Sequence, residues 1–154
     1  MSVRSAVKAP RIAACLAAAA LAACAGTAPP GGWGEDPVLD RLAGDFYERI
    51  SNRRFNSIAT YRDPALREFF RTTQAWSDYY ANLVQALDDA HFEAIRPTRI
   101  QLLAIARAGP EQVIVSVRFT GENGLPLRWW RTRIVREDQW EREDGRWWIV
   151  PGKL

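Results

Sequence analysis

The hydrophobic period of this 154-residue chain changes near His91, and that change most constrains its fold. Before His91, apolar residues recur every three or four positions, as they do in amphipathic helices. After it, apolar and polar residues alternate, which is typical of half-buried strands. Helices followed by a run of strands predict an α+β fold in which the N-terminal helices pack on one face of an antiparallel sheet.

Three helical segments are predicted before His91. The first runs to Ile50 and begins at Asp36-Pro37, an N-cap residue followed by a proline in the first turn. A second segment covers residues 55–61 and is broken at Asp63-Pro64. The third covers residues 76–89 and has a clear apolar face.

The second half predicts strands at residues 98–107, 112–120 and 127–136. A last hairpin is expected to pair residues 139–142 with 146–150 across Asp144-Gly145, a strong two-residue turn signal. The strand side chains expected to face the helices are Val113, Val115, Val117, Phe119, Ile100, Leu102, Ala104 and Ala106.

The N-terminal 23 residues have the pattern of an export signal. Three cations precede an uncharged apolar run, residues 12–23, which is too short to cross a bilayer. The segment that follows, residues 24–37, is rich in Gly, Pro and Ala and is expected to be a tether. We therefore expect a signal peptide at 1–23, a tether at 24–37 and a folded domain at 38–154.

The quartet Leu21-Ala22-Ala23-Cys24 resembles the lipobox of bacterial lipoproteins. Small residues suit a narrow peptidase cleft, and a cysteine thiolate can form a thioether with a diacylglycerol. The resemblance implies cleavage before Cys24, lipidation of Cys24 including an amide-linked acyl chain, and a membrane anchor. Ala25 in place of aspartate implies the outer membrane, with the domain facing the periplasm. The alternative is an ordinary cleaved signal that happens to contain a cysteine.

Removal of the signal changes the charge balance. The 21 Lys and Arg residues fall by three to 18, which equals the 18 Asp and Glu residues. A general nucleic-acid binder would carry a basic excess, so that class is excluded. Cys15 leaves with the signal, so no disulfide is expected and a packed core must supply the stability.

Residues 46–55 are similar to the first-helix segment of the nuclear transport factor 2-like (cystatin-like) superfamily, and residues 140–151 are similar to its closing hairpin. The resemblance implies a cone in which helices close over a curved antiparallel sheet, with a cavity between them. Many members have a strand between the second and third helices, and no clear strand is found there in this sequence. The superfamily contains isomerases, cyclases, dehydratases and non-catalytic members, so the fold does not give the function.

An enzyme of this type needs an acid or base inside the cavity. The single histidine, His91, has Asp88, Asp89 and Glu93 nearby, but it lies between elements, where such a cluster is more often a solvated junction. No catalytic residue, metal ligand or cofactor is predicted. The tyrosines expected to be core residues, with their hydroxyls at the rim, are Tyr47, Tyr61, Tyr79 and Tyr80.

The most unusual segment is residues 127–136, which mixes tryptophan with arginine on both faces of the predicted strand. One tryptophan is expected to fill the core and the other to lie outside beside arginines. Such side chains are enriched in interface hot spots, although stacking of guanidinium groups on aromatic rings along a solvated sheet is an equal alternative. The candidate interface residues are Trp129, Trp130, Arg131, Arg133 and Trp148.

The sequence therefore predicts a lipid-anchored, non-catalytic envelope domain that binds a protein partner, a second copy of itself or a small apolar ligand. One alternative is a small-molecule enzyme of the isomerase or cyclase type, and another is an accessory subunit of a secretion or transport complex. A buried Asp or Tyr with a strongly shifted pKa would favour the enzyme. A flat apolar patch around Trp130 and Trp148 would favour partner binding.

Overall fold

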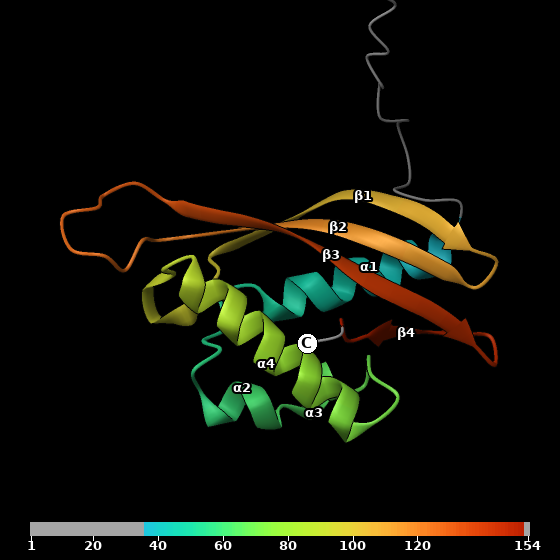
Figure 1. The fold of residues 1–154 in the computed structure, drawn as a ribbon. Helices are drawn as coiled ribbons and strands as arrows, with labels where there is room; N and C mark the ends of the chain where they lie inside the picture. The colour runs from blue at the N-terminus through green and yellow to red at the C-terminus, as the bar shows by residue number, and fades with distance from the viewer. Residues whose placement is uncertain (1–35, 153–154) are drawn as a thin grey trace, which may run out of the picture.

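A computed structural model describes residues 36–152, so the predicted signal, Cys24 and nearly all of the predicted tether lie outside the described residues. Four antiparallel strands in the order β1-β2-β3-β4 form a curved sheet, and the helices lie on one side of it (Figure 1). This confirms the predicted α+β fold. The elements are α1 (Pro37–Ile50), α2 (Ile58–Arg62), α3 (Pro64–Arg67), α4 (Thr73–Asp89), the 3-10 turn η1 (Glu93–Ile95), β1 (Arg99–Gly109), β2 (Gln112–Gly121), β3 (Thr132–Glu143) and β4 (Arg146–Val150).

Helix α1 starts where its capping signal predicts. The Asp36 carboxylate accepts hydrogen bonds from the backbone N–H groups of Val38 (2.9 Å) and Leu39 (3.3 Å), and Pro37 occupies the first turn. The other carboxylate oxygen of Asp36 accepts a hydrogen bond from the ring N–H of Trp147 at 2.9 Å. The helix start is thereby tied to strand β4, at the β3–β4 hairpin end of the sheet.

Aromatic rings fill the space between the helices and the sheet. Phe46 of α1 contacts Tyr79 of α4 and Trp140 of β3, as well as Phe69 and Phe70 in the connection between α3 and α4. Val113, Val115, Val117 and Phe119 of β2 face the same layer, as predicted, and are buried. The interior of the expected cone is therefore packed with side chains at its centre.

The prediction for the second half of β1 is wrong, because the strand contains a β-bulge. The register with β2 shifts between Leu102 and Ala104, which leaves Leu103 as an extra residue. A shift of one residue exchanges the two faces of a strand. Ile105 consequently packs against the core, whereas Ala104 and Ala106 are exposed on the outer face.

The predicted break between residues 136 and 139 is also wrong. Strand β3 is continuous from Thr132 to Glu143, and Glu137 and Asp138 pair with β2 like their neighbours. Conversely, residues 127–131 lie before the strand rather than in it. Leu127 has φ +62°, which is incompatible with an extended strand.

Within residues 36–152, none of the helices combines the length and the apolar character needed to cross a membrane.

Candidate functional site

The connection between β2 and β3, residues 122–131, is the candidate binding element and is called here the tryptophan loop. Its base is fixed to the turn that follows α4. The backbone N–H of Glu93 donates to the carbonyl of Glu122 at 2.9 Å, and the N–H of Gly124 donates to the carbonyl of His91 at 2.8 Å. These bonds hold the start of the loop against the helical layer.

The residue before the loop, Gly121, has no room for a side chain. A Cβ atom at this position would lie 2.5 Å from Cδ1 of Phe92 and 2.8 Å from the carbonyl oxygen of Arg96. Real Cβ contacts are essentially never this short, and the second obstacle is backbone that cannot swing away. Close packing at Gly121 therefore fixes the direction in which the loop leaves the sheet.

The tip of the tryptophan loop carries the two most exposed large apolar side chains that the structure describes, Leu127 and Trp129, together with the half-exposed Trp130. Leu127 is 98% exposed, Trp129 89% and Trp130 49%. The two indole rings meet edge to face with centroids 6.2 Å apart, and the Arg128 guanidinium lies 5.5 Å from the Trp130 ring centroid. Figure 1 shows the loop, in orange, extending beyond the helices. Leu127 adopts a left-handed backbone conformation, which costs about 1–2 kcal/mol of folding free energy. The loop conformation that exposes these apolar side chains therefore lowers the stability of the domain.

Three arginines cluster behind the loop on the outer face of the sheet. Arg99 and Arg133 flank Thr120 in one cross-strand row, and Arg118 lies in the next row on the same face. None of the three has an ion-pair partner among residues 36–152. Arg131 does have one, because its Nε lies 3.2 Å from Oε1 of Glu122. The outer face therefore has an unneutralised positive charge at the loop end.

The structure brings together four of the five predicted interface residues and separates the fifth. Trp129, Trp130, Arg131 and Arg133 lie at the loop end of the sheet. Trp148 pairs with Glu141, eight residues along β3 from Arg133, which is about 26 Å. It is covered there by the Arg146 guanidinium, 4.1 Å from the ring centroid. A flat patch around Trp130 and Trp148 is therefore not formed.

The expectation that one of Trp129 and Trp130 fills the core is wrong. Both residues precede β3, so they do not follow the alternation of that strand. The inward positions of β3 are taken by Ile134, Asp138 and Trp140 instead. Both indoles are left at the surface.

A buried polar cluster, which the sequence did not predict, lies between the helices and the sheet. The Tyr47 hydroxyl of α1 and the Tyr79 hydroxyl of α4 both donate to Oδ2 of Asp138, at 2.7 Å and 2.9 Å. Arg136 donates to the other carboxylate oxygen at 3.3 Å, and its guanidinium lies 5.3 Å from the Tyr79 ring centroid. The signal that could have found it is an acidic residue at an inward position of β3, opposite the buried Val115.

Burial and charge keep the two tyrosine hydroxyls of this cluster protonated. Burial raises the pKa of both tyrosines well above 10, and the Asp138 carboxylate adds to the shift because it repels a phenolate. Both hydroxyls therefore remain protonated donors at neutral pH. The Arg136 guanidinium supplies the opposite charge for the Asp138 carboxylate.

As placed, the cluster is closed to a substrate. Asp138 is only 3% exposed, and both tyrosines are buried. Both carboxylate oxygens already accept hydrogen bonds from protein groups, so Asp138 is poorly arranged to act as a general base. Neither of the two surface hollows described among residues 36–152 is lined by a member of the cluster. This geometry is that of a structural network.

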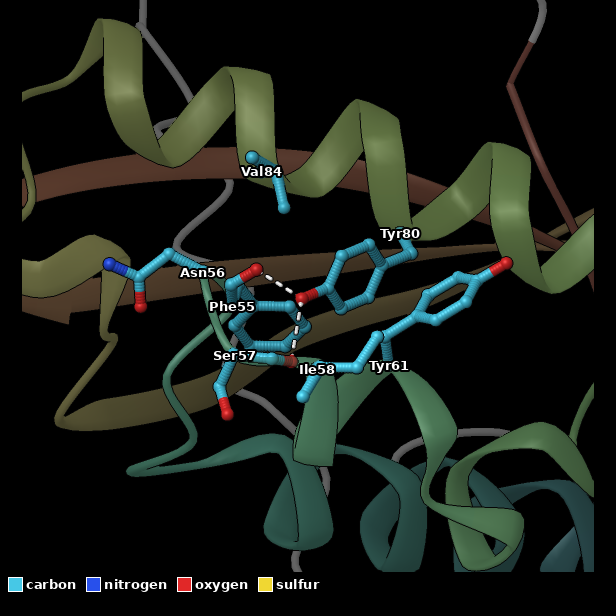
Figure 2. Close-up of a pocket in the computed structure, with 7 residues that line it drawn as sticks. All are labelled: Phe55, Asn56, Ser57, Ile58, Tyr61, Tyr80 and Val84. Carbon is cyan, nitrogen blue, oxygen red and sulfur yellow. Dashed lines mark hydrogen bonds between the residues drawn. The ribbon is translucent and has the colours of Figure 1, made fainter.

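The larger of these two hollows lies between α2 and α4 and has a volume of about 290 Å³ (Figure 2). The Tyr80 hydroxyl, at its floor, donates to the backbone carbonyls of Phe55 and Ser57. Its one proton is therefore already engaged, and the remaining surface is mainly apolar. The hollow suits at most a small apolar ligand. The residues that line it are Phe55, Asn56, Ser57, Ile58, Tyr61, Tyr80 and Val84.

His91 lies in the tight turn after α4, with φ +58°, and its backbone carbonyl accepts a hydrogen bond from the N–H of Gly124 at the base of the tryptophan loop. In the part of the chain that the structure describes, no group of three His, Cys, Asp or Glu side chains is placed to hold a metal ion.

No protein family, no curated protein and no solved structure matches this chain. The functional assignment therefore depends on the chain's own residues.

Proposed function

We propose that this chain is a lipid-anchored protein of the cell envelope whose non-catalytic domain binds another envelope component through the tryptophan loop. The observation that carries the proposal is the fixed loop with three exposed apolar side chains beside unpaired arginines. Tryptophan and arginine are the residue types most enriched in binding hot spots. A soluble domain gains no stability by displaying them, so their exposure favours a binding role.

The proposed fold family is the nuclear transport factor 2-like superfamily. The order of helices and then an antiparallel meander supports it, as does the closing hairpin around Asp144-Gly145. Among the described residues, no strand lies between α2 and α4, where many members have one. The aromatic packing around Phe46 and the closed Asp138 cluster favour a filled cone over a ligand-binding one.

The proposed anchor is the acylated thiol of Cys24, at the outer membrane and facing the periplasm. The Leu21-Ala22-Ala23-Cys24 motif after a basic and then apolar segment supports it. Metabolic labelling with a fatty-acid analogue tests the anchor. We expect the native protein to incorporate the label and the Cys24→Ser variant not to incorporate it. Equal labelling of both proteins would contradict acylation at Cys24.

The loop's role is tested by placing a photo-crosslinking residue at position 129 in living cells. Ala81 provides the matched control, since it is an exposed apolar residue of α4 on the helical side of the domain and does not line the hollow. Crosslinks to a lipid or a protein at position 129 and none at position 81 are expected. Absence of crosslinks at both positions would reject the loop as a binding element.

A second candidate function, an isomerase-type or cyclase-type enzyme, is favoured by the buried cluster. Tyr47, Tyr79 and Asp138 are acid/base groups that are linked by hydrogen bonds between the helices and the sheet. Catalysis requires that the cluster open to solvent without unfolding. Reversible titration of Tyr47 and Tyr79 in the folded protein would support the enzyme, and titration that coincides with unfolding would reject it.

A further inference from the structure

We infer that the tryptophan loop docks on the surface of an anionic phospholipid bilayer, with the outer face of the sheet tilted toward the lipid. The inference rests on the proposed function and names what the loop binds. It adds a second membrane contact to the proposed anchor at Cys24.

The tip of the loop has the chemistry of a bilayer interface. Leu127 is 98% exposed in a turn, and Trp129, two residues further along the chain, is 89% exposed. Tryptophan prefers the headgroup level, where its ring meets apolar chains and its N–H meets polar groups. A protein hot spot, by contrast, is usually central in a broad and well-packed patch. A tip that extends beyond the helices and bears two such exposed side chains fits insertion into lipid better.

The charges behind the tip complement an extended negative surface. Arg99 and Arg133 lie on strands two apart, about 10 Å from each other, and Arg118 lies one row further along the sheet. No side chain among residues 36–152 neutralises them. Charges spread over three strands match many phosphates better than they match one carboxylate.

Apart from Glu122, which forms an ion pair with Arg131 in the loop, the acidic side chains at this end lie on the helical layer. Asp88 and Asp89 close helix α4, and Glu93 belongs to η1, on the helical side of the sheet. The first outward-facing acid on β3 is Glu137, one row beyond Arg118. Docking with the outer face toward the bilayer therefore brings the arginines close to the lipid and keeps the helix-layer acids away from it.

The length of the chain before the domain allows both membrane contacts together. Asp36 lies at the β3–β4 hairpin end, and the loop lies at the other end of β3, a strand of 12 residues and about 40 Å. Cys24 precedes Asp36 by twelve residues, which reach at most about 40 Å. Because the outer face of the docked sheet is tilted toward the lipid, Asp36 lies closer to the bilayer than the full length of the sheet. An acylated Cys24 can therefore remain in the bilayer while the tip of the loop touches it.

The test uses the acylated protein in vesicles of phosphatidylcholine alone or of phosphatidylcholine mixed with phosphatidylglycerol. The processed domain has no other cysteine, so Leu127→Cys introduces a unique free thiol for an environment-sensitive fluorophore. Ala81→Cys, on the exposed face of α4, is the matched control. We expect a blue shift and protection from an aqueous quencher at position 127 only, and only in anionic vesicles.

Neutralising the arginines tests the charge contribution separately. At low salt, Arg99→Gln, Arg118→Gln and Arg133→Gln should each lower the ratio of docked to undocked protein about fivefold. Arg62→Gln, an exposed arginine of α2, should leave the ratio unchanged.

An unchanged fluorophore at position 127 in both vesicle types would overturn the inference. If position 129 nevertheless crosslinks to a protein in cells, the loop binds a protein and the proposed function stands without the lipid contact. If no crosslink forms either, both proposals fail.

Discussion

Replacing Asp138 by asparagine should destabilise the domain far more than any surface change of the same chemistry. The carboxylate accepts two tyrosine hydroxyls and one arginine N–H group in the core. An amide has one acceptor oxygen, so either the hydroxyls or Arg136 must face an NH₂ group. If the oxygen stays with the tyrosines, the Arg136 guanidinium loses its counter-charge.

The magnitude follows from the cost of removing one partner of a buried ion pair, about 3–5 kcal/mol. Arg136 keeps 17% of its side chain exposed, which favours the lower end of that range. We therefore expect Asp138→Asn to lower the free energy of unfolding by about 3 kcal/mol, a large part of the roughly 5–15 kcal/mol of a typical domain.

Urea unfolding followed by tryptophan fluorescence measures this change, with Glu137→Gln as the matched control. Glu137 neighbours Asp138 but is exposed on the outer face, so its substitution should change stability by less than about 0.5 kcal/mol. If the two variants unfold at the same urea concentration with the same slope, the buried network does not stabilise the core.

Three further predictions concern the same domain. Because burial raises the pKa of Tyr47 and Tyr79 well above 10, their contribution to stability is complete below about pH 10. Above that pH the free energy of unfolding should fall by about 1.4 kcal/mol per pH unit for each tyrosine. Urea titrations at alkaline pH measure this slope, and Tyr79→Phe should reduce it by the contribution of one tyrosine. Gly121→Ala should lower the free energy of unfolding by about 1–3 kcal/mol because its Cβ clashes with the backbone. Gly44→Ala in α1, with nothing within 4 Å, should raise it by about 0.5–1 kcal/mol, and equal effects of the two substitutions in urea unfolding would contradict the packing at Gly121. Asp36→Ala should lower the free energy of unfolding by about 1–2 kcal/mol, since it removes both the cap of α1 and the hydrogen bond to Trp147. Urea unfolding measures this change, and an unchanged stability would show that neither interaction stabilises the domain.

Features with a local signal were predictable from the sequence. The start of α1 follows from Asp36-Pro37. The Asp36 side chain accepts hydrogen bonds from the N–H groups of Val38 and Leu39, and the Pro37 ring fixes a helical φ in the first turn. The β3–β4 turn follows from Asp144-Gly145, both of which adopt positive φ. The inward face of β2 follows from its strict alternation.

Features that depend on distant contacts were not predictable. The bulge at Leu103 lies in an apolar run, where either alternation buries leucine, so only the pairing with β2 selects the face. Asp138 lies 91 residues from Tyr47, and no local pattern shows that an acidic residue has two hydroxyl partners in the core. Tryptophan, leucine and arginine at 127–131 suit a strand by composition, yet Gly121 and the contacts to the turn after α4 hold them in a loop.

The envelope assignment depends on the thiol of Cys24, and the intact mass of the N-terminal peptide from the membrane fraction tests it most directly. The expected peptide starts at Cys24 and carries the mass of a diacylglycerol thioether together with an amide-linked acyl chain. A peptide that starts at Met1, or one that starts at Cys24 with an unmodified thiol, would contradict the lipid anchor.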